Sequence, residues 1–131
     1  ELRKKNIFLI DMKKSFSDLV NEAAKEVQEI DIFQLKHLIE SKYNFSLVDI
    51  REDNEIKTGV IENSIHIGRG VLDRDIEGHI SDPTEEIVLY CARGVRSIVG
   101  AKTLQDMGYQ KVFSLKGGIT EWIETGFKLK E

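Results

Sequence analysis

Apolar residues along the chain gather in five short runs that are typical of strands. Between several of these runs, apolar residues recur every three or four positions, which predicts amphipathic helices. The predicted strands are 28–31, 45–50, 64–67, 87–90 and 111–115, and the predicted helices are 15–27, 32–41, 97–107 and 117–123. Strands that alternate with helices form βα units with right-handed crossovers. We therefore predict an α/β fold, an open parallel five-stranded sheet with helices on both faces.

The run Ile87–Tyr90 is wholly apolar, and it contains no charge or proline that would protect an exposed edge. We therefore expect it to be a central strand that is buried on both faces. It leads directly into Cys91, and Gly94 follows before the helix predicted over 97–107. Because ligands of open α/β sheets bind at the carboxyl ends of the strands, Cys91 lies at the expected edge for a functional site.

The N-terminal residues precede this pattern of strands and helices. We interpret residues 1–27 as an N-terminal extension and residues 28–131 as the domain. The apolar face of the helix predicted over 15–27 needs a surface to cover, either on this domain or on a partner. Met12 begins Met-Lys-Lys-Ser-Phe, a typical bacterial start, so we interpret residues 1–11 as non-native.

At 131 residues, with 40% hydrophobic and 32% charged residues, the chain has the composition of one folded domain. The net charge of −4 provides no basic surface, so we predict no nucleic-acid partner. No apolar run approaches the roughly 18 residues of a membrane span, so we predict no membrane partner. Cys91 is the only cysteine, which excludes an internal disulfide and favours a reducing compartment, the cytoplasm. The histidines and Cys91 lack the spacing of metal ligands, and we predict neither a metal nor another cofactor.

The segment Cys91-Ala-Arg-Gly-Val-Arg-Ser97 combines a nucleophile with an anion-binding pattern. A thiolate is the reactive form of cysteine, and helix-start amides together with Arg93 and Arg96 favour a negative charge there. Gly94 lets the backbone turn where a side chain would clash, so that N–H groups of the loop can point inward as an anion nest. The alternative is that Cys91 is a small buried hydrophobic residue, as lone cysteines often are.

Four motifs, in order along the chain, resemble those of the rhodanese-like sulfurtransferases, in which a cysteine opens a six-residue active-site loop. The motifs are Leu47-Val-Asp-Ile-Arg-Glu52, Glu55-x-x-x-Gly59-x-Ile61 with Ser64-Ile-His-Ile67, Cys91-Ala-Arg-Gly-Val-Arg-Ser97, and Leu115-Lys-Gly-Gly-Ile119 with Trp122 and Gly126. The resemblance covers most of the chain from about residue 28 onward. It implies the rhodanese-like fold and the activity of a single-domain thiosulfate sulfurtransferase.

The resemblance also implies a mechanism, in which Cys91 takes a sulfane sulfur as a persulfide and hands it to a nucleophilic acceptor. The donor is then thiosulfate or a persulfide, and the acceptor is a thiol or cyanide, with a protein partner in a sulfur relay as a further option. Arg96 is expected to close the loop and Arg93 to attract the anionic donor. The predicted substrate-binding residues are Ala92, Arg93, Gly94, Val95, Arg96, Ser97 and Arg51, and Asp49 is predicted to support the loop.

Two other functions fit the same pattern. One is a phosphatase or arsenate reductase, because the cell-cycle dual-specificity phosphatases share this fold. Their loops have one more residue between cysteine and arginine, which makes room for a tetrahedral oxyanion. Four residues separate Cys91 from Arg96, which favours sulfur transfer. The other is a non-catalytic rhodanese-like binding module, although such modules commonly lack the cysteine that this chain keeps.

Overall fold

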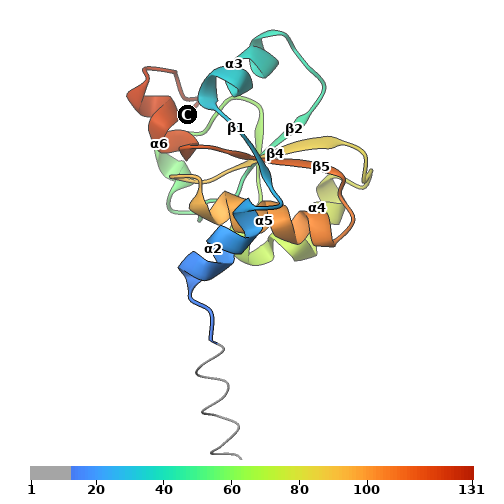
Figure 1. Ribbon diagram of the computed structural model, residues 1–131. Coiled ribbons are helices and arrows are strands. Elements are labelled where there is room, and N and C mark those ends of the chain that lie inside the picture. Colours follow the sequence, from blue (N-terminus) through green and yellow to red (C-terminus); the bar gives the residue numbers. More distant parts are fainter. Residues whose placement is uncertain (1–12) are drawn as a thin grey trace, which may run out of the picture.

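Five parallel strands form an open sheet in the computed structural model, which describes residues 13–131 (Figure 1). The strands are β1 (Gln28–Ile30), β2 (Ser46–Asp49), β3 (Ser64–His66), β4 (Glu86–Tyr90) and β5 (Lys111–Leu115). Their order across the sheet is β1-β5-β4-β2-β3, and every neighbouring pair is parallel. The predicted parallel five-stranded sheet is therefore confirmed, and β4 lies at its centre as expected.

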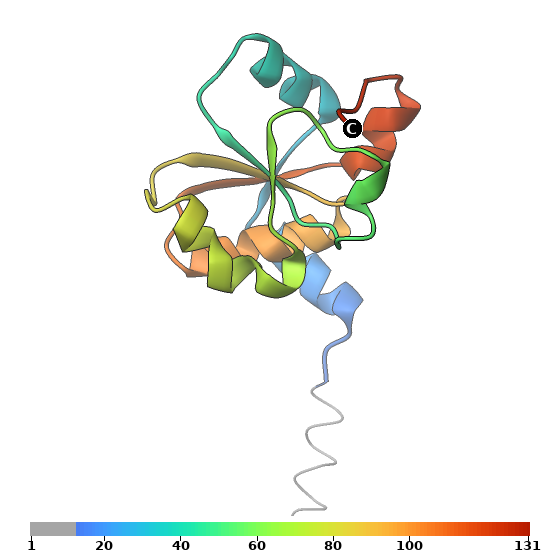
Figure 2. The same cartoon turned by 180° about the vertical axis from the view of Figure 1, so that it is seen from behind.

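Helices cover both faces of this sheet. They are α2 (Phe16–Ala24), α3 (Ile32–Glu40), α4 (Leu72–His79), α5 (Val95–Asp106) and α6 (Gly118–Glu124), with two short 3-10 helices, η1 (Ile56–Thr58) and η2 (Arg69–Val71). Figures 1 and 2 show α3 and α6 on one face of the sheet, and α2, α4 and α5 on the other. The helices thus sit on both sides of the sheet, as the alternation of strands and helices predicts.

Strand β4 supplies side chains to both cores of the protein. Ile87 and Leu89 belong to the apolar cluster that α4 and α5 cover, whereas Val88 and Tyr90 belong to the cluster beneath α3 and α6. All four residues are at most 2% exposed. Because successive residues of a strand point to opposite faces, this burial requires an unbroken apolar run. Each such side chain contributes about 2 kcal/mol of stability.

Helix α2 packs on α5, but its apolar face is only partly covered, because Phe16 and Leu19 are 54% and 45% exposed. It buries Ala23, and the following Val27, in the core that α5 covers. The helix begins with a capping box at Ser15 and ends at Ala24, three residues before the predicted end, because a turn leads the chain into β1. The predicted non-native residues 1–11 lie outside the described part of the chain, and the proposed domain boundary stays a prediction.

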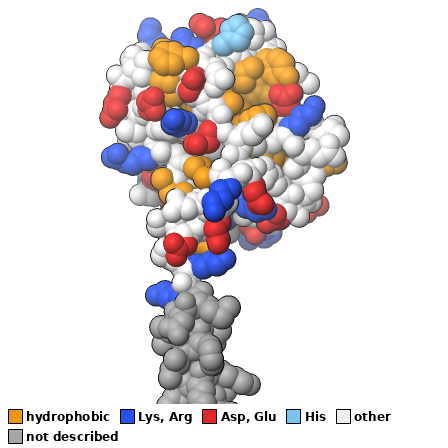
Figure 3. Space-filling view, viewed as in Figure 1, with side chains coloured by type: hydrophobic (Ala, Val, Ile, Leu, Met, Phe, Trp, Pro, Cys, Tyr) orange, Lys and Arg blue, Asp and Glu red, His pale blue; other side chains and the backbone are white. Residues whose placement is uncertain are grey.

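Charged side chains of both signs are mixed over the face of the molecule that Figure 3 shows. Hydrophobic side chains form separate patches on this face, and no continuous basic patch is visible there. This distribution agrees with the small negative net charge of −4. Within residues 13–131, no helix combines the length and the apolar character that crossing a membrane requires.

Candidate active site

The carboxyl ends of β2, β4 and β5 lie side by side and carry most of the predicted site residues. The last residue of β2, Asp49, is in register with Tyr90, and Cys91 follows Tyr90 directly. The loop after β4 therefore lies above the middle of the sheet, at the edge where open α/β folds bind ligands. Cys91 is only 1% exposed, so its sulfur lies inside the loop rather than on the surface.

Gly94 turns this loop into α5. Its φ of 91° lies in the left-handed region, which glycine adopts more readily than other residues. A Cβ at this position would also lie 3.0 Å from the carbonyl oxygen of Leu115 and 3.1 Å from the nitrogen of Gly117. Helix α5 then begins at Val95, two residues before the predicted start, so that Ser97 lies in its first turn. The helix thus reaches further into the loop than the sequence pattern indicated.

Two polar groups contact the Cys91 sulfur. The backbone N–H of Gly94 donates a hydrogen bond to Sγ at 3.2 Å, and the Ser97 hydroxyl oxygen lies 3.5 Å from Sγ. The loop also opens onto the amino end of α5, a helix of 12 residues, where unpaired amides favour negative charge. The loop therefore offers several hydrogen-bond donors to a negatively charged sulfur, the form in which cysteine acts as a nucleophile.

The first turn of α6 holds the backbone of the loop in place. The amides of Ile119 and Thr120 donate to the carbonyl oxygens of Cys91 and Ala92, at 3.0 and 2.9 Å. Gly118, with φ of 58°, permits this approach, because a Cβ there would lie 2.5 Å from both oxygens. In a planar trans peptide group the carbonyl and the N–H point in opposite directions. Because the carbonyl groups of Cys91 and Ala92 face α6, the N–H groups of Ala92 and Arg93 point away from α6. Gly118, the first residue of α6, thus allows the helix to orient the loop amides.

Arg96 is paired with Glu55, a partner that no sequence pattern revealed. Its two terminal nitrogens donate to both carboxylate oxygens of Glu55, at 2.8 and 2.9 Å. The backbone N–H of Glu52 donates to the same carboxylate at 2.8 Å. The hydrogen bonds from Arg96 are the largest of the effects that lower the pKa of Glu55 from 4.5 to about 2. The only signal in the sequence was the motif beginning at Glu55, which matched the family pattern without indicating Arg96.

Asp49 and Arg51 form a buried ion pair that supports Glu55. Arg51 Nη2 lies 2.8 Å from Asp49 Oδ2, and the two residues are 4% and 0% exposed. The same guanidinium donates to the carbonyl oxygens of Glu55 and Gly59, at 3.1 and 2.9 Å. Each nitrogen of this guanidinium thus has a protein partner, and the substrate-binding role of Arg51 stays a prediction. The ion pair holds the segment from which Glu55 reaches Arg96.

A family model for the rhodanese-like domain matches residues 33–125 of the chain. The matched segment runs from α3 through α6 and includes the whole Cys91 loop. The chain belongs to the rhodanese-like family. This membership confirms the resemblance drawn from the four motifs.

Relatives of this rhodanese-like chain include named sulfurtransferases. It is 30% identical over 103 residues to a sulfurtransferase of Allochromatium vinosum, covering 79% of this chain and 94% of that protein. It is 29% identical over 97 residues to the thiosulfate sulfurtransferase GlpE of Shewanella oneidensis, covering 74% of this chain and 93% of that protein. A solved structure from Rhodopseudomonas palustris, of a protein of unknown function described as a possible tyrosine phosphatase, matches with a TM-score of 0.82 and 29% identity. This match covers 90% of this chain and 96% of that protein.

Arg93 and Val95 lie on the outer side of the rhodanese-like loop, and both are exposed. Within residues 13–131, no carboxylate forms an ion pair with Arg93, so its positive charge stays free near the Cys91 loop. The charge of Arg96, in contrast, is paired with Glu55. Two arginines that look equivalent in the sequence therefore have different surroundings, one open to solvent and one fixed.

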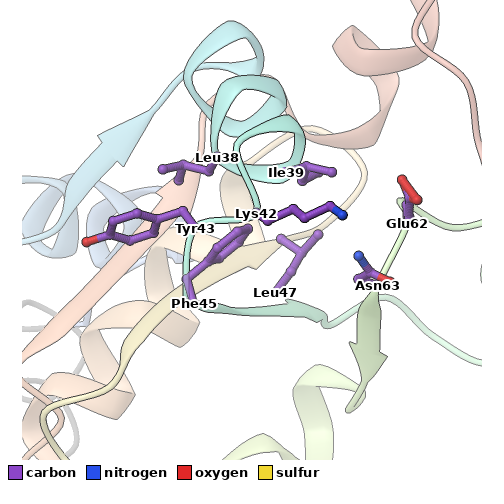
Figure 4. A pocket seen from close by; sticks show the side chains of 8 residues that line it. All are labelled: Leu38, Ile39, Lys42, Tyr43, Phe45, Leu47, Glu62 and Asn63. Atoms are coloured by element: carbon purple, nitrogen blue, oxygen red, sulfur yellow. The ribbon is translucent and has the colours of Figure 1, made fainter.

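A separate hollow of about 240 Å³ lies at the opposite edge of the rhodanese-like sheet. Figure 4 shows its lining, which is Leu38, Ile39, Lys42, Tyr43, Phe45, Leu47, Glu62 and Asn63. Most of these residues precede the amino ends of β2 and β3, whereas Cys91 follows the carboxyl end of β4. The hollow is therefore remote from the Cys91 loop. In the part of the chain that the structure describes, no group of three or more His, Cys, Asp or Glu residues could hold a metal ion.

Proposed function

We propose that this protein is a sulfurtransferase in which Cys91 carries a sulfane sulfur from a small anionic donor, thiosulfate or a persulfide, to a nucleophilic acceptor. One observation carries the proposal: the Gly94 amide and the Ser97 hydroxyl both contact the Cys91 sulfur inside a short loop. Four residues separate Cys91 from Arg96, which suits a single sulfur atom better than a phosphate. The relatives named sulfurtransferases support the same reaction class.

The reaction consists of two displacements at sulfur. In the first, the Cys91 thiolate attacks the outer sulfur of thiosulfate, the S–S bond of the donor breaks, and sulfite leaves with its electron pair. Cys91 is then a persulfide with a negative terminal sulfur. In the second, cyanide or a thiolate attacks that terminal sulfur and forms thiocyanate or a new persulfide, while the S–S bond breaks and returns the Cys91 thiolate. Each step moves one sulfur atom, so no further oxidant or reductant is needed.

The loop residues have separate roles in this proposal. The N–H groups of Ala92–Ser97 surround the transferred sulfur and stabilise its negative charge. Arg96 keeps the loop closed through its contact with Glu55. Arg93, with its free charge, attracts the anionic donor. The binding groups and the nucleophile therefore all come from one short segment of the chain.

We also infer that the protein works in a reducing compartment, the cytoplasm, because its lone cysteine is a free thiol that must stay reduced to react. The acceptor in such a compartment is a thiol, for which cyanide serves as a laboratory substitute. A partner protein in a sulfur relay would supply either the donor persulfide or the accepting thiol.

A steady-state assay separates sulfur transfer from the two alternatives. Wild-type protein supplied with thiosulfate and cyanide should produce thiocyanate, and the Cys91→Ser variant should produce none. An aryl phosphate should not be hydrolysed, because the loop is too short for its phosphate group to reach Cys91. Hydrolysis of the phosphate without thiocyanate production would support a phosphatase, and the absence of both activities would support a binding module.

A further inference from the structure

Two buried hydroxyl groups lie behind the Cys91 sulfur. Ser97 Oγ is 3.5 Å from Sγ, and Ser114 Oγ of β5 is 2.7 Å from Ser97 Oγ. Both serines are 0% exposed. A line of three polar atoms therefore runs from the sulfur into the core of the protein. The proposed reaction assigns no role to Ser114, although its hydroxyl contacts Ser97, which in turn contacts the nucleophile.

The number of hydrogens available for these two contacts depends on whether Cys91 is a thiol or a thiolate. Three atoms are joined by two contacts, and each contact needs one hydrogen. With a thiolate there are two hydrogens, and both contacts are made when Ser114 donates to Ser97 and Ser97 donates to Sγ. A neutral thiol adds a third hydrogen, and within residues 13–131 Ser97 Oγ is the one hydrogen-bond partner of Ser114 Oγ. Because a buried hydroxyl hydrogen without an acceptor is costly, the line fits the thiolate better.

The buried polar residues in the described part of the chain lie around the Cys91 loop. Among residues 13–131, the polar or charged residues that are buried are Asp49, Arg51, Ser97 and Ser114. The first two hold the segment that carries Glu55, and Ser97 contacts the sulfur. An alanine at position 114 would fill nearly the same space without burying a hydroxyl group. The position of Ser114 therefore indicates a role in the loop rather than in packing.

We propose that Ser114 is a positioning residue, whose hydroxyl group orients the Ser97 hydroxyl so that it donates to the Cys91 thiolate. This inference rests on the proposed function, because the thiolate is the attacking group in that reaction. Ser114 itself does not touch the donor or the acceptor. Its effect reaches the sulfur through Ser97, and removing it leaves Ser97 free to turn its hydrogen elsewhere.

The charged groups near the sulfur do not obscure this effect. Arg93 and Arg96 come from the loop and from the first turn of α5, and Arg96 is paired with Glu55. From β5 the uncharged Ser114 contacts Ser97, and from the end of β2 the buried Asp49 and Arg51 are paired with each other. Helix α6 contributes amides to the loop carbonyl groups, with the exposed Glu121 near its start. The arginines stay charged up to strongly alkaline pH. Near neutral pH, the contacts from Ser114 through Ser97 to Cys91 can therefore be tested without a change in the charge of these arginines.

The test is the rate at which iodoacetamide alkylates Cys91, the sole thiol, as a function of pH. In Ser114→Ala we expect the rate at neutral pH to fall about threefold to tenfold, because a hydrogen bond to a charged sulfur is weakened. Ser114→Thr keeps a hydroxyl and should react within about twofold of wild type. In a Ser97→Ala background, Ser114→Ala should have no further effect.

Equal alkylation of wild type and folded Ser114→Ala at neutral pH would overturn the proposal, as would an undiminished effect in the Ser97→Ala background. Thermal melting establishes that each variant folds. If Ser114→Ala does not fold, the wild-type protein provides the test. As the pH is varied, the NMR chemical shift of the Ser114 hydroxymethyl group should change in parallel with the ultraviolet absorbance of the thiolate. A constant chemical shift would overturn the proposal. Alkylation needs no sulfur donor, so a failure of sulfur transfer is distinguished from a failure of this proposal.

Discussion

The Cys91 loop is held in two different ways. On one side, the amides of α6 bind two carbonyl groups of the loop, and Gly118 makes that close approach possible. On the other side, Arg96 reaches Glu55 through side chains that are 31% and 27% exposed. The α6 anchor depends on shape, whereas the Glu55 anchor depends on charge. We therefore expect the first to respond to a single methyl group and the second to respond to pH and salt.

The two anchors also control different parts of the loop. The α6 anchor fixes the peptide groups that follow Cys91, and so it sets the direction of the loop amides. The Glu55 anchor fixes the side chain of Arg96 on the first turn of α5, and so it holds the loop closed. Loss of the first should therefore remove the binding groups for sulfur, whereas loss of the second should only loosen them.

Gly118→Ala should break the α6 anchor and have the largest effect. The new methyl group would lie 2.5 Å from the carbonyl oxygens of Cys91 and Ala92, and a φ of 58° is strained for alanine. We expect the free energy of unfolding to fall by about 3 kcal/mol or more. Persulfide formation on Cys91 should be lost as well. Urea unfolding and sulfur loading measured by mass spectrometry check the two effects.

Gly126→Ala is the matched control for this variant. Gly126 has a φ of 94°, but nothing lies within 4 Å of a Cβ at this position. The control therefore shares the backbone strain without the clash, and we expect a loss of only about 1 kcal/mol with normal sulfur loading. Equal losses of stability in the two variants would show that the contact between α6 and the loop has no importance of its own.

Glu55→Gln should weaken the second anchor more mildly. Glutamine keeps the shape of the side chain but removes its charge, so Arg96 loses an ionic partner. We expect the free energy of unfolding to fall by about 1 kcal/mol, and the sulfur-transfer rate to fall severalfold. Asp75→Asn is the control, because it disrupts the exposed pair of Arg74 and Asp75 on α4, away from the loop. An unchanged sulfur-transfer rate in Glu55→Gln would argue against a role for the Glu55 anchor.

The Glu55 anchor should also depend on pH in a defined direction. The pKa of Glu55 is about 2 in the folded protein, below its ordinary value of 4.5. A carboxylate with a lowered pKa stabilises the folded state above its ordinary pKa, and this contribution is lost as pH falls through the folded value. The stability difference between wild type and Glu55→Gln should thus be largest above about pH 5 and should shrink from pH 4.5 towards pH 2. Urea unfolding at a series of pH values measures it, and a constant difference would contradict the charge-dependent anchor.

Arg93→Ala should leave both anchors intact and have the smallest effect on stability. The free charge near the loop attracts an anionic donor, so we expect KM for thiosulfate to rise about threefold to tenfold with little change in kcat. The dependence of kcat/KM on salt should weaken as well. Lys111→Ala removes an exposed charge at the opposite edge of the sheet, where β5 begins, and serves as the control. If both variants behave alike, the effect comes from net charge rather than from Arg93.

The sheet and the position of Cys91 at its edge could be predicted from the sequence because their signals are local. The apolar run Ile87–Tyr90 indicated a central strand, and the position of Cys91 at its end followed from chain order. The start of α5 could not be predicted as well. The helix was predicted to begin at Ser97, but it begins at Val95 after Gly94 in a left-handed conformation, which no side-chain pattern reveals.

The partners of the loop were harder to predict, because they are distant along the chain. Glu55 is 41 residues from Arg96, and Ser114 is 17 residues from Ser97. No periodicity connects such pairs, since only the order of the strands brings them together. The surroundings of Arg51 could not be predicted for the same reason, because nothing local indicates that its guanidinium meets the carbonyl groups of Glu55 and Gly59.

The central claim, that Cys91 carries sulfur, is tested most directly by the intact mass of the protein after incubation with thiosulfate alone. Wild type should gain the mass of one sulfur atom, and later addition of cyanide should remove it. The Cys91→Ser variant should gain nothing, because its hydroxyl group has no comparable anionic form at neutral pH. A wild-type protein whose mass stays unchanged after exposure to thiosulfate would contradict this account.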